Sequence, residues 1–442
     1  MTKKIIRALW GDLHGKELVK FSLLAAGIFF LIGSYWPLKT LKDSIFINLV
    51  GPLYLPQAKL ASLALFFPLV LIYSKLVDIF SKEKMIYILV AFYSTIGLGL
   101  IYGLYHPVWG IQNTTSSPSR VVGWAFYLFV ESYVSLMVSL YWSFINDITT
   151  PESAKKGYGL IIFGAQFGGV LFLLLGNYLS YDTTQYATSV PIVAFISVMM
   201  FFMIAAIVFL LKKLVGDEHM EGYVTQAMEE SAPAKVGFFD GLKVLITRPY
   251  VSGIFILIFF QELITTLMGF QMSIIVKKTF ADPGMINKFF FEFNLAIQVI
   301  ACGFALIGTS FFQRRFGIKF CLIAFPLLIG VSIASYVLYP SLSSIIFVML
   351  IARALNYTLY QPAKEVLYIP TSKNIKYKAK AWIDMFGVRF AKATGSGISG
   401  LIGPVISIVG ATCFGIIAVW IGASTMIGNM YQKVTNSKKF ID

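Results

Sequence analysis

The sequence Lys212-Lys-Leu-Val-Gly-Asp-Glu-His-Met-Glu221 begins the longest polar interruption in an otherwise apolar chain. The interruption runs from Lys212 to Thr247 and leaves six apolar runs on each side. An even division of this kind is typical of membrane carriers built from two repeated bundles. The sequence therefore predicts an N-terminal six-helix bundle at 1–211, a cytoplasmic linker at 212–247 and a C-terminal six-helix bundle at 248–442.

The composition excludes an ordinary soluble domain. Of the 442 residues, 57% are hydrophobic and only 13% are charged, and the mean hydropathy is +0.77. A helix needs about 20 apolar residues to cross a bilayer, and twelve runs near that length recur along the chain. We place them at about 20–37, 58–80, 85–105, 122–145, 158–180, 189–211, 249–275, 288–312, 318–339, 342–360, 381–404 and 407–430. The predicted fold is an all-α, major-facilitator-like membrane protein with twelve transmembrane helices.

The distribution of lysine and arginine predicts the orientation, because cytoplasmic loops collect these residues. With the N-terminus inside, the loops on the opposite face keep few basic residues, namely Lys59, Arg120, Lys277, Lys278 and Lys288. Both termini are then cytoplasmic. The net charge of +15 is explained first by topology and contact with anionic membrane lipid. An anionic solute is a second explanation, and we expect no nucleic acid partner.

The sequence lacks the motifs of an enzyme. The three cysteines lie apart in apolar stretches and the three histidines are far from one another, so neither disulfides nor a metal site is predicted. Gly395-Ser-Gly-Ile-Ser-Gly400 has the spacing of a dinucleotide-binding loop, but no strand precedes it. There is no phosphate-binding loop with lysine and serine or threonine, and no set for covalent catalysis. We predict a non-enzymatic protein without a cofactor.

Basic residues inside apolar spans are the strongest candidates for a functional site. Arg389 and Lys392 lie in the small-residue stretch Gly387-Val-Arg-Phe-Ala-Lys-Ala-Thr-Gly-Ser-Gly397. A cation within a span costs roughly 2.5 to 3.5 kcal/mol on insertion scales and usually serves a function. Lys42 follows Pro37, which is expected to interrupt the first helix. For Lys42, a binding role and a role as an interfacial anchor both remain open.

Three further spans carry polar candidates. In the fourth span, Glu131 is a carboxylate at depth, which indicates an ion or proton pathway or pairing with a buried base. Asn146 shares a helical face with four other polar or aromatic residues of that span, and such a face can line a site or hold helices together. In the tenth span the candidates are Arg353, Tyr357 and Gln361. For Arg353, a structural salt bridge and a substrate contact remain open, and the seventh span offers Gln261 and Glu262 among others.

Two motifs carry a family resemblance. Tyr357-Thr-Leu-Tyr-Gln-Pro-Ala-Lys-Glu-Val-Leu-Tyr-Ile-Pro370, followed by Gly387-Val-Arg-Phe-Ala-Lys392, resembles the signature of the non-mitochondrial ATP/ADP translocases. These are nucleotide transporters of obligate intracellular bacteria and plastids. Further matches are Leu38–Asp43, Leu140–Thr149 and Leu245–Tyr250, so the resemblance covers most of the chain in order.

The resemblance implies twelve helices and exchange of nucleotides across a membrane, which in a bacterium is the inner membrane. It also implies that charged residues in spans 1, 4, 7 and 11 bear on transport. Lys42, Glu131 and Lys392 fall on three of these positions. At the fourth, Met268 stands where an acidic residue is usual, and Gln361 replaces the usual aspartate of the span 10 motif.

The residues and the resemblance together predict an exchanger of ATP or another nucleoside phosphate against ADP or a related nucleotide, functional as a monomer. Lys42 is expected to face Arg389 and Lys392 across a cavity. Like charges about 4 Å apart interact by about 4 kcal/mol at an effective dielectric constant of 20, so an empty site should repel itself and a polyphosphate should relieve the repulsion. The alternative is a proton-coupled importer of nucleotides or NAD, with Glu131 binding the proton.

Overall fold

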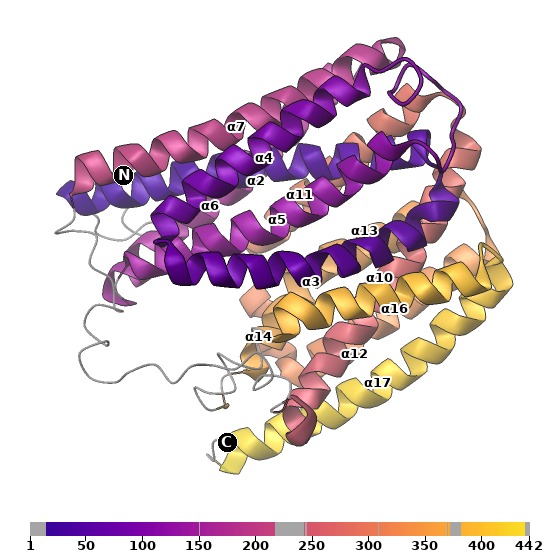
Figure 1. Ribbon diagram of the computed structural model, residues 1–442. Helices are drawn as coiled ribbons and strands as arrows, with labels where there is room; N and C mark the ends of the chain where they lie inside the picture. Colours follow the sequence, from indigo (N-terminus) through magenta and orange to yellow (C-terminus); the bar gives the residue numbers. More distant parts are fainter. Residues whose placement is uncertain are drawn as a thin grey trace. The chain divides into compact units, whose positions relative to one another are not determined.

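The computed structural model describes residues 15–149, 151–216, 243, 245–307, 309–368, 370–371 and 382–437. Regular structure in these ranges is helical, apart from a single bridge residue at Thr371. Figure 1 shows the elements in chain order. The first are α2 (Gly15–Leu49), η1 (Pro52–Tyr54), α3 (Leu55–Ile79), α4 (Lys82–Leu104), α5 (Val121–Asp147), α6 (Pro151–Leu179), η2 (Thr183–Gln185) and α7 (Tyr186–Val215). They are followed by α10 (Pro249–Thr279), α11 (Pro283–Ile307), α12 (Thr309–Leu338), α13 (Leu342–Leu355), η4 (Asn356–Tyr360), α14 (Gln361–Leu367), η6 (Ile383–Gly387), α16 (Val388–Ile402) and α17 (Ile406–Ser437).

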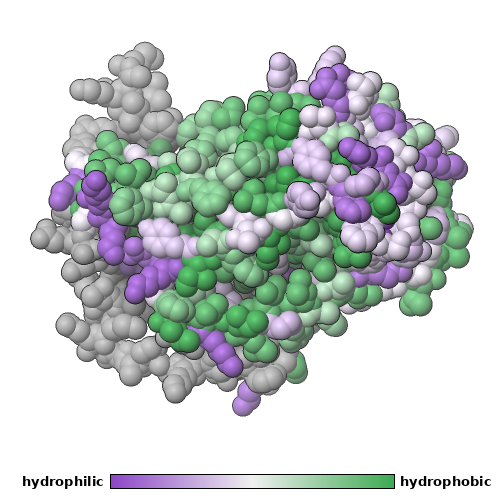
Figure 2. Space-filling model, turned by 45° about the horizontal axis from the view of Figure 1, so that its top comes forward, coloured by the Kyte–Doolittle hydropathy of each residue, from purple (hydrophilic) through white to green (hydrophobic). Residues whose placement is uncertain are grey.

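The prediction of an all-α membrane protein is confirmed. Within the described ranges, nine helices are long and apolar enough to cross a membrane. Large hydrophobic side chains stay exposed on them, for example Leu71 at 62% and Phe209 at 60%. Figure 2 shows hydrophobic residues over much of the face in view, with hydrophilic residues toward its margins. An apolar surface of this extent is stable against lipid and not in water.

The helices pack into two compact units. Unit 1 takes in the described residues of Met1–Gly51, Ala64–Pro233 and Phe280–Leu295, and unit 2 takes in those of Pro52–Leu63, Ala234–Thr279 and Ala296–Asp442. In unit 1, α2 packs against α5, α6 and α7. In unit 2, α10 packs against α13, α16 and α17, while α12 packs against α13, α14 and α17. Most of the predicted linker, at 217–242, lies outside the described residues.

The first span is longer than the sequence indicated. Pro37 lies inside α2, which continues to Leu49, so the expectation that Pro37 interrupts this helix is wrong. Proline removes one backbone N–H, but neighbouring helices make such a defect tolerable in membrane helices. In consequence Lys42 lies within the helix, and its side chain is placed by packing with the rest of unit 1.

Two glycines of α6 allow it to approach α2 closely. At Gly164 and Gly168 an added Cβ atom would collide with the backbone carbonyl groups of Ala25 and Phe29. Small residues four positions apart are a common device for close helix contact in membranes. This contact holds α6 against α2, the helix that carries Lys42.

We expect Gly168→Ala to destabilise the protein by about 1–3 kcal/mol, because the helices must separate to admit the methyl group. The matched control is Gly99→Ala on α4, where an added Cβ meets nothing within 4 Å. That change should be neutral or slightly stabilising, since alanine favours a helix over glycine by about 1 kcal/mol. Thermal unfolding of both variants in detergent measures the difference, and equal melting temperatures would contradict it.

Candidate functional site

Lys42 is the centre of a buried charge cluster in unit 1. Its residue is only 6% exposed, and its Nζ donates to Glu131 Oε1 on α5 at 2.5 Å. Asp43 Oδ1 lies 3.3 Å from the same ammonium group, which also lies over the ring of Tyr127 at 4.5 Å from the centroid. A charge this deeply buried is stable only with partners of this kind.

This geometry bears on the interpretation of Lys42 as an interfacial anchor. An interfacial anchor would extend its amine along the helix toward the headgroups, whereas Lys42 points across to α5. The anchor interpretation is therefore wrong. Both Glu131 and Asp43 lie within ion-pair distance of the ammonium group, so Glu131 pairs with a buried base, one of the alternatives that the sequence left open. Glu131 is one third exposed, so the cluster is in reach of solvent at its acidic side.

Unit 2 contains a second buried lysine that the sequence analysis missed as a site residue. Lys364 on α14 is 3% exposed, and its Nζ donates to Gln261 Oε1 on α10 at 2.5 Å. The same ammonium group lies over the ring of Tyr360, 4.8 Å from the centroid. Lys364 follows Gln361 and Pro362 and precedes Glu365 in the sequence, a polar setting that resembles a cytoplasmic loop.

A chain of polar contacts continues from Lys364 to Lys392. Gln261 Nε2 donates to Glu262 Oε1 at 3.3 Å, and Glu262 Oε2 lies 3.8 Å from Lys392 Nζ on α16. The Lys392 side chain is 47% exposed and that of Glu262 is 19% exposed. Lys392 thus combines a loose ion pair with access to solvent, while the residues behind it are buried.

The two clusters repeat one arrangement with the charges redistributed. In each unit, a residue of a long helix bonds to a charged residue, and a tyrosine four positions before that charged residue lies under the ammonium group of the pair. Residues four positions apart lie on one helix face. In unit 1 the Tyr127 ring and Glu131 both reach Lys42, whereas in unit 2 the Tyr360 ring lies under Lys364 itself. The equivalent residues are Lys42 and Gln261, Asp43 and Glu262, Tyr127 and Tyr360, and Glu131 and Lys364.

Tyr360 is held rigidly beneath Lys364. Its ring is fully buried and stacks on Phe325, with centroids 4.3 Å apart and planes at 18°. Its hydroxyl accepts a hydrogen bond of 2.8 Å from Trp420 Nε1. An aromatic side chain enclosed in this way acts as packing and as a cation–π partner. It does not offer a free face to a ligand.

The other predicted site residues do not belong to these two clusters. Asn146 is exposed and accepts a hydrogen bond of 2.5 Å from the Tyr158 hydroxyl. Gln361 is exposed and donates to Glu365 on its own helix at 3.3 Å. Arg353 and Arg389 are half-buried on α13 and α16, and the side chain of Tyr357 lies outside the described residues. Of the eight predicted residues, Lys42 and Glu131 are in direct contact in the described part of the chain. Lys392 contacts Glu262, which is not one of the eight.

Two π-helical turns stand directly before the lysines of unit 2. The turn η4 precedes α14, which carries Lys364, and η6 precedes α16, which carries Lys392. A π-helical turn adds a residue to a helix, re-aims the side chains that follow and occurs often at functional sites. Asn356, the first residue of η4, has a buried Oδ1 without a hydrogen-bond partner in the described part of the chain. These turns have no evident sequence signal.

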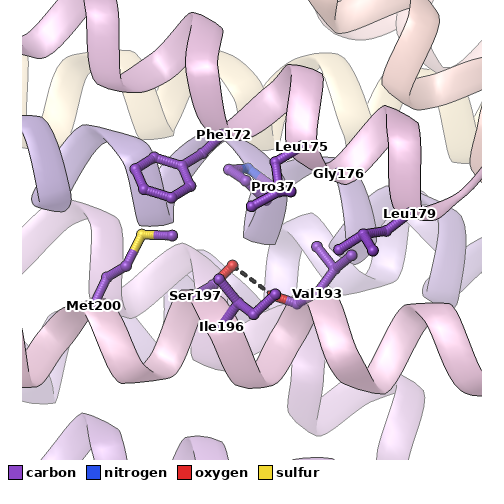
Figure 3. A pocket seen from close by; sticks show the side chains of 9 residues that line it. All are labelled: Pro37, Phe172, Leu175, Gly176, Leu179, Val193, Ile196, Ser197 and Met200. Carbon is purple, nitrogen blue, oxygen red and sulfur yellow. Dashed lines mark hydrogen bonds between the residues drawn. The ribbon is translucent and has the colours of Figure 1, made fainter.

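A recess in unit 1 does not belong to these clusters. It lies among α2, α6 and α7, next to Pro37, and is narrow. Figure 3 shows that its lining is almost entirely apolar, and that the Ser197 hydroxyl is turned to the backbone, where it donates to Val193 O. A recess of this chemistry offers nothing that would bind a charged solute.

The clusters supply charge and hydrogen bonds, but not the parts of a covalent reaction. Across the described ranges, no group of three histidine, cysteine or acidic residues is placed to hold a metal ion. What the arrangement provides is pairs of opposite charge that join neighbouring helices inside an apolar body. Intramembrane ionisable groups of this kind typically line solute or ion pathways.

Comparison with known proteins places these clusters in context. The chain is 23% identical to the ADP,ATP carrier protein 1 of Rickettsia typhi, with 98% of this chain and 97% of that one covered. It is 24% identical to the plastidic ATP/ADP-transporter of Solanum tuberosum, over 95% of this chain and 75% of that one. A solved bacterial homologue of the iron transporter ferroportin shares its fold, with a TM-score of 0.66 and 11% identity over 94% of this chain and 98% of that one.

The solved structures that it resembles are membrane transporters of the major-facilitator type, which agrees with the predicted fold. The sequence model of the TLC ATP/ADP transporters matches residues 1–348 and 342–431, which is nearly the whole chain. The chain therefore belongs to the TLC ATP/ADP transporter family.

Proposed function

We propose that this transporter exchanges ATP or another nucleoside phosphate against ADP or a related nucleotide by alternating access. The observation that carries the proposal is Lys392, a half-exposed ammonium group on a small-residue helix of an otherwise apolar chain. Relatives along the whole chain are named ADP,ATP carriers, which supports a nucleotide as the solute.

The chemistry of phosphate fits the exposed cation. Arg389 precedes Lys392 by three positions on α16, so the two groups lie on neighbouring positions of one helix face. Guanidinium and ammonium groups form charge-assisted hydrogen bonds with phosphate oxygens. Since Lys392 lies 3.8 Å from its carboxylate partner, a phosphate can take it over at small cost. A loaded carrier then holds Lys392 in a closer charge pair than the long one of the empty carrier, which favours exchange over one-way movement.

The architecture that goes with this function is part of the proposal. We infer twelve membrane spans in two six-helix halves, 1–211 and 248–442, joined by a cytoplasmic linker at 212–247. Both termini are then cytoplasmic, and in a bacterium the protein lies in the inner membrane as a monomer in contact with lipid. The excess of basic residues in the loops assigned to the inner face supports this orientation.

Counter-exchange in proteoliposomes tests the function. We expect uptake of labelled ATP to rise at least about tenfold when the vesicles contain ADP, because only a loaded carrier closes readily. The uptake should be unaffected by an uncoupler. Uptake that ignores internal nucleotide and collapses when the pH gradient is removed would contradict exchange.

A second candidate, proton-coupled import of nucleotides or NAD, is favoured by one observation. In unit 1 two carboxylates, Asp43 and Glu131, share the ammonium group of Lys42. Glu131 is one third exposed, so it can take up a proton while Lys42 keeps an ion pair with Asp43. Membrane carboxylates in this position commonly relay protons. Uptake driven by an imposed pH gradient into vesicles without internal nucleotide would favour this candidate.

A further inference from the structure

The Glu262 carboxylate is held by a hydrogen bond from a buried neighbour, whereas the ammonium group of its partner, Lys392, is on a half-exposed side chain. One carboxylate oxygen accepts a hydrogen bond from Gln261, which is 4% exposed and is itself held by the buried Lys364. The other oxygen faces Lys392 at 3.8 Å. The carboxylate is therefore attached to a rigid support, whereas the ammonium group stands at the end of a long, half-exposed side chain.

The geometry of this pair indicates competition. A distance of 3.8 Å between Oε2 and Nζ is longer than a charge-assisted hydrogen bond, which is usually about 2.7–2.9 Å. Loose, exposed pairs are held only weakly. Any anion that reaches Lys392 with good geometry must replace Glu262 as its partner, and the carboxylate, being anchored, cannot follow.

We propose that Glu262 is the resting counter-ion of Lys392, which the phosphate groups of the solute displace, and that the Gln261–Lys364 contact positions it for this role. Glu262 then tunes affinity by competing with the solute and neutralises Lys392 when the carrier is empty. The inference rests on the proposed function for the identity of the solute as a phosphate-bearing anion. The family resemblance would place an acidic residue at the position of Met268 on α10. The inference assigns that role to Glu262, six positions earlier on the same helix.

Binding to purified protein tests the competition. Glu262→Gln should lower the Kd for ATP by about two- to fivefold, the range expected when a weak exposed pair is removed. In the Lys392→Gln background the same change should have no effect, because the competitor has then lost its partner. The matched control is Glu292→Gln on α11, an exposed carboxylate outside the cluster, which should leave the Kd unchanged.

A second measurement does not depend on transport of any nucleotide. The rate at which an amine-reactive reagent acylates Lys392, followed by mass spectrometry without ligand, should rise about two- to fivefold in Glu262→Gln. Tripolyphosphate, used as a base-free probe, should protect Lys392 at a lower concentration in that variant than in the wild type.

The outcomes separate the two proposals. If the wild type exchanges nucleotides but Glu262→Gln weakens binding, or changes it equally in the Lys392→Gln background, Glu262 contacts the solute or only supports the fold, and the inference fails. If tripolyphosphate protects Lys392 as expected but no nucleotide is exchanged, the inference stands and the proposed nucleotide exchange fails. A lack of protection by both ATP and tripolyphosphate overturns the inference directly.

Discussion

Lys42→Met is expected to abolish exchange and to lower the free energy of unfolding by about 3 kcal/mol, the low end for breaking a buried ion pair. The low end applies because Glu131 is one third exposed and keeps some hydration. Methionine fills a similar volume, so the loss of stability is caused by removal of the positive charge and not by a cavity. Without the ammonium group, the carboxylates that now lie 2.5 Å and 3.3 Å from it repel each other and any anionic solute.

Two further variants separate the fold from transport. Removing the second charge as well, in Lys42→Met with Glu131→Met, should restore part of the lost stability, since replacing a buried pair by apolar residues is often neutral and the remaining Asp43 side chain is 26% exposed. Exchange should not return. Lys39→Met, on the same helix, is the control for loss of a lysine beside aromatic rings, and it should cost only about 1 kcal/mol. Full exchange by the double variant would show that the Lys42 charge is not needed for transport.

The fold was largely predictable from hydropathy, because a bilayer imposes a length on every span. The ends of the spans were less predictable. Pro37 was expected to end the first helix, but α2 continues to Leu49. A proline inside a bundle destabilises its helix only to the extent that neighbouring groups leave the freed backbone carbonyl without a hydrogen bond. Likewise Phe280–Leu295 packs with unit 1, although it follows the linker in sequence. Local patterns carry no information about such contacts.

The candidate site was predictable in its charges but not in their partners. A cation in an apolar span stands out because it is costly, and this identified Lys42 and Lys392. The partner depends on the rotation of two helices about their axes, which the composition of either helix does not determine. Lys364 was missed for a different reason, since the polar residues Gln361 and Glu365 on either side of it resemble a loop. The equal spacing of Tyr127 and Glu131 and of Tyr360 and Lys364 was the available signal.

Lys392→Gln is expected to lower exchange by about 10- to 100-fold, which corresponds to the loss of one charge-assisted hydrogen bond worth about 1.5–3 kcal/mol. Stability should change by less than about 1 kcal/mol, because the side chain is 47% exposed and its ion pair is long. A large loss of transport with a small change in stability is the opposite of the effect expected for a residue that only supports the fold. Initial rates of ATP and ADP exchange, measured beside thermal unfolding of the same preparation, give both quantities.

The matched control is Lys212→Gln. Lys212 also forms an exposed ion pair, with Glu83 at 3.2 Å, and its side chain is 52% exposed, so its removal imposes a similar loss of charge and packing. We expect exchange to remain within about twofold of the wild type, since surface pairs of this kind contribute at most about 1 kcal/mol. If both lysine variants lost exchange equally, general electrostatic attraction toward the basic surface would explain the effect. If neither did, the anion would be held by other groups, and Arg389 would be the next to replace, because it occupies the adjacent turn of the same helix.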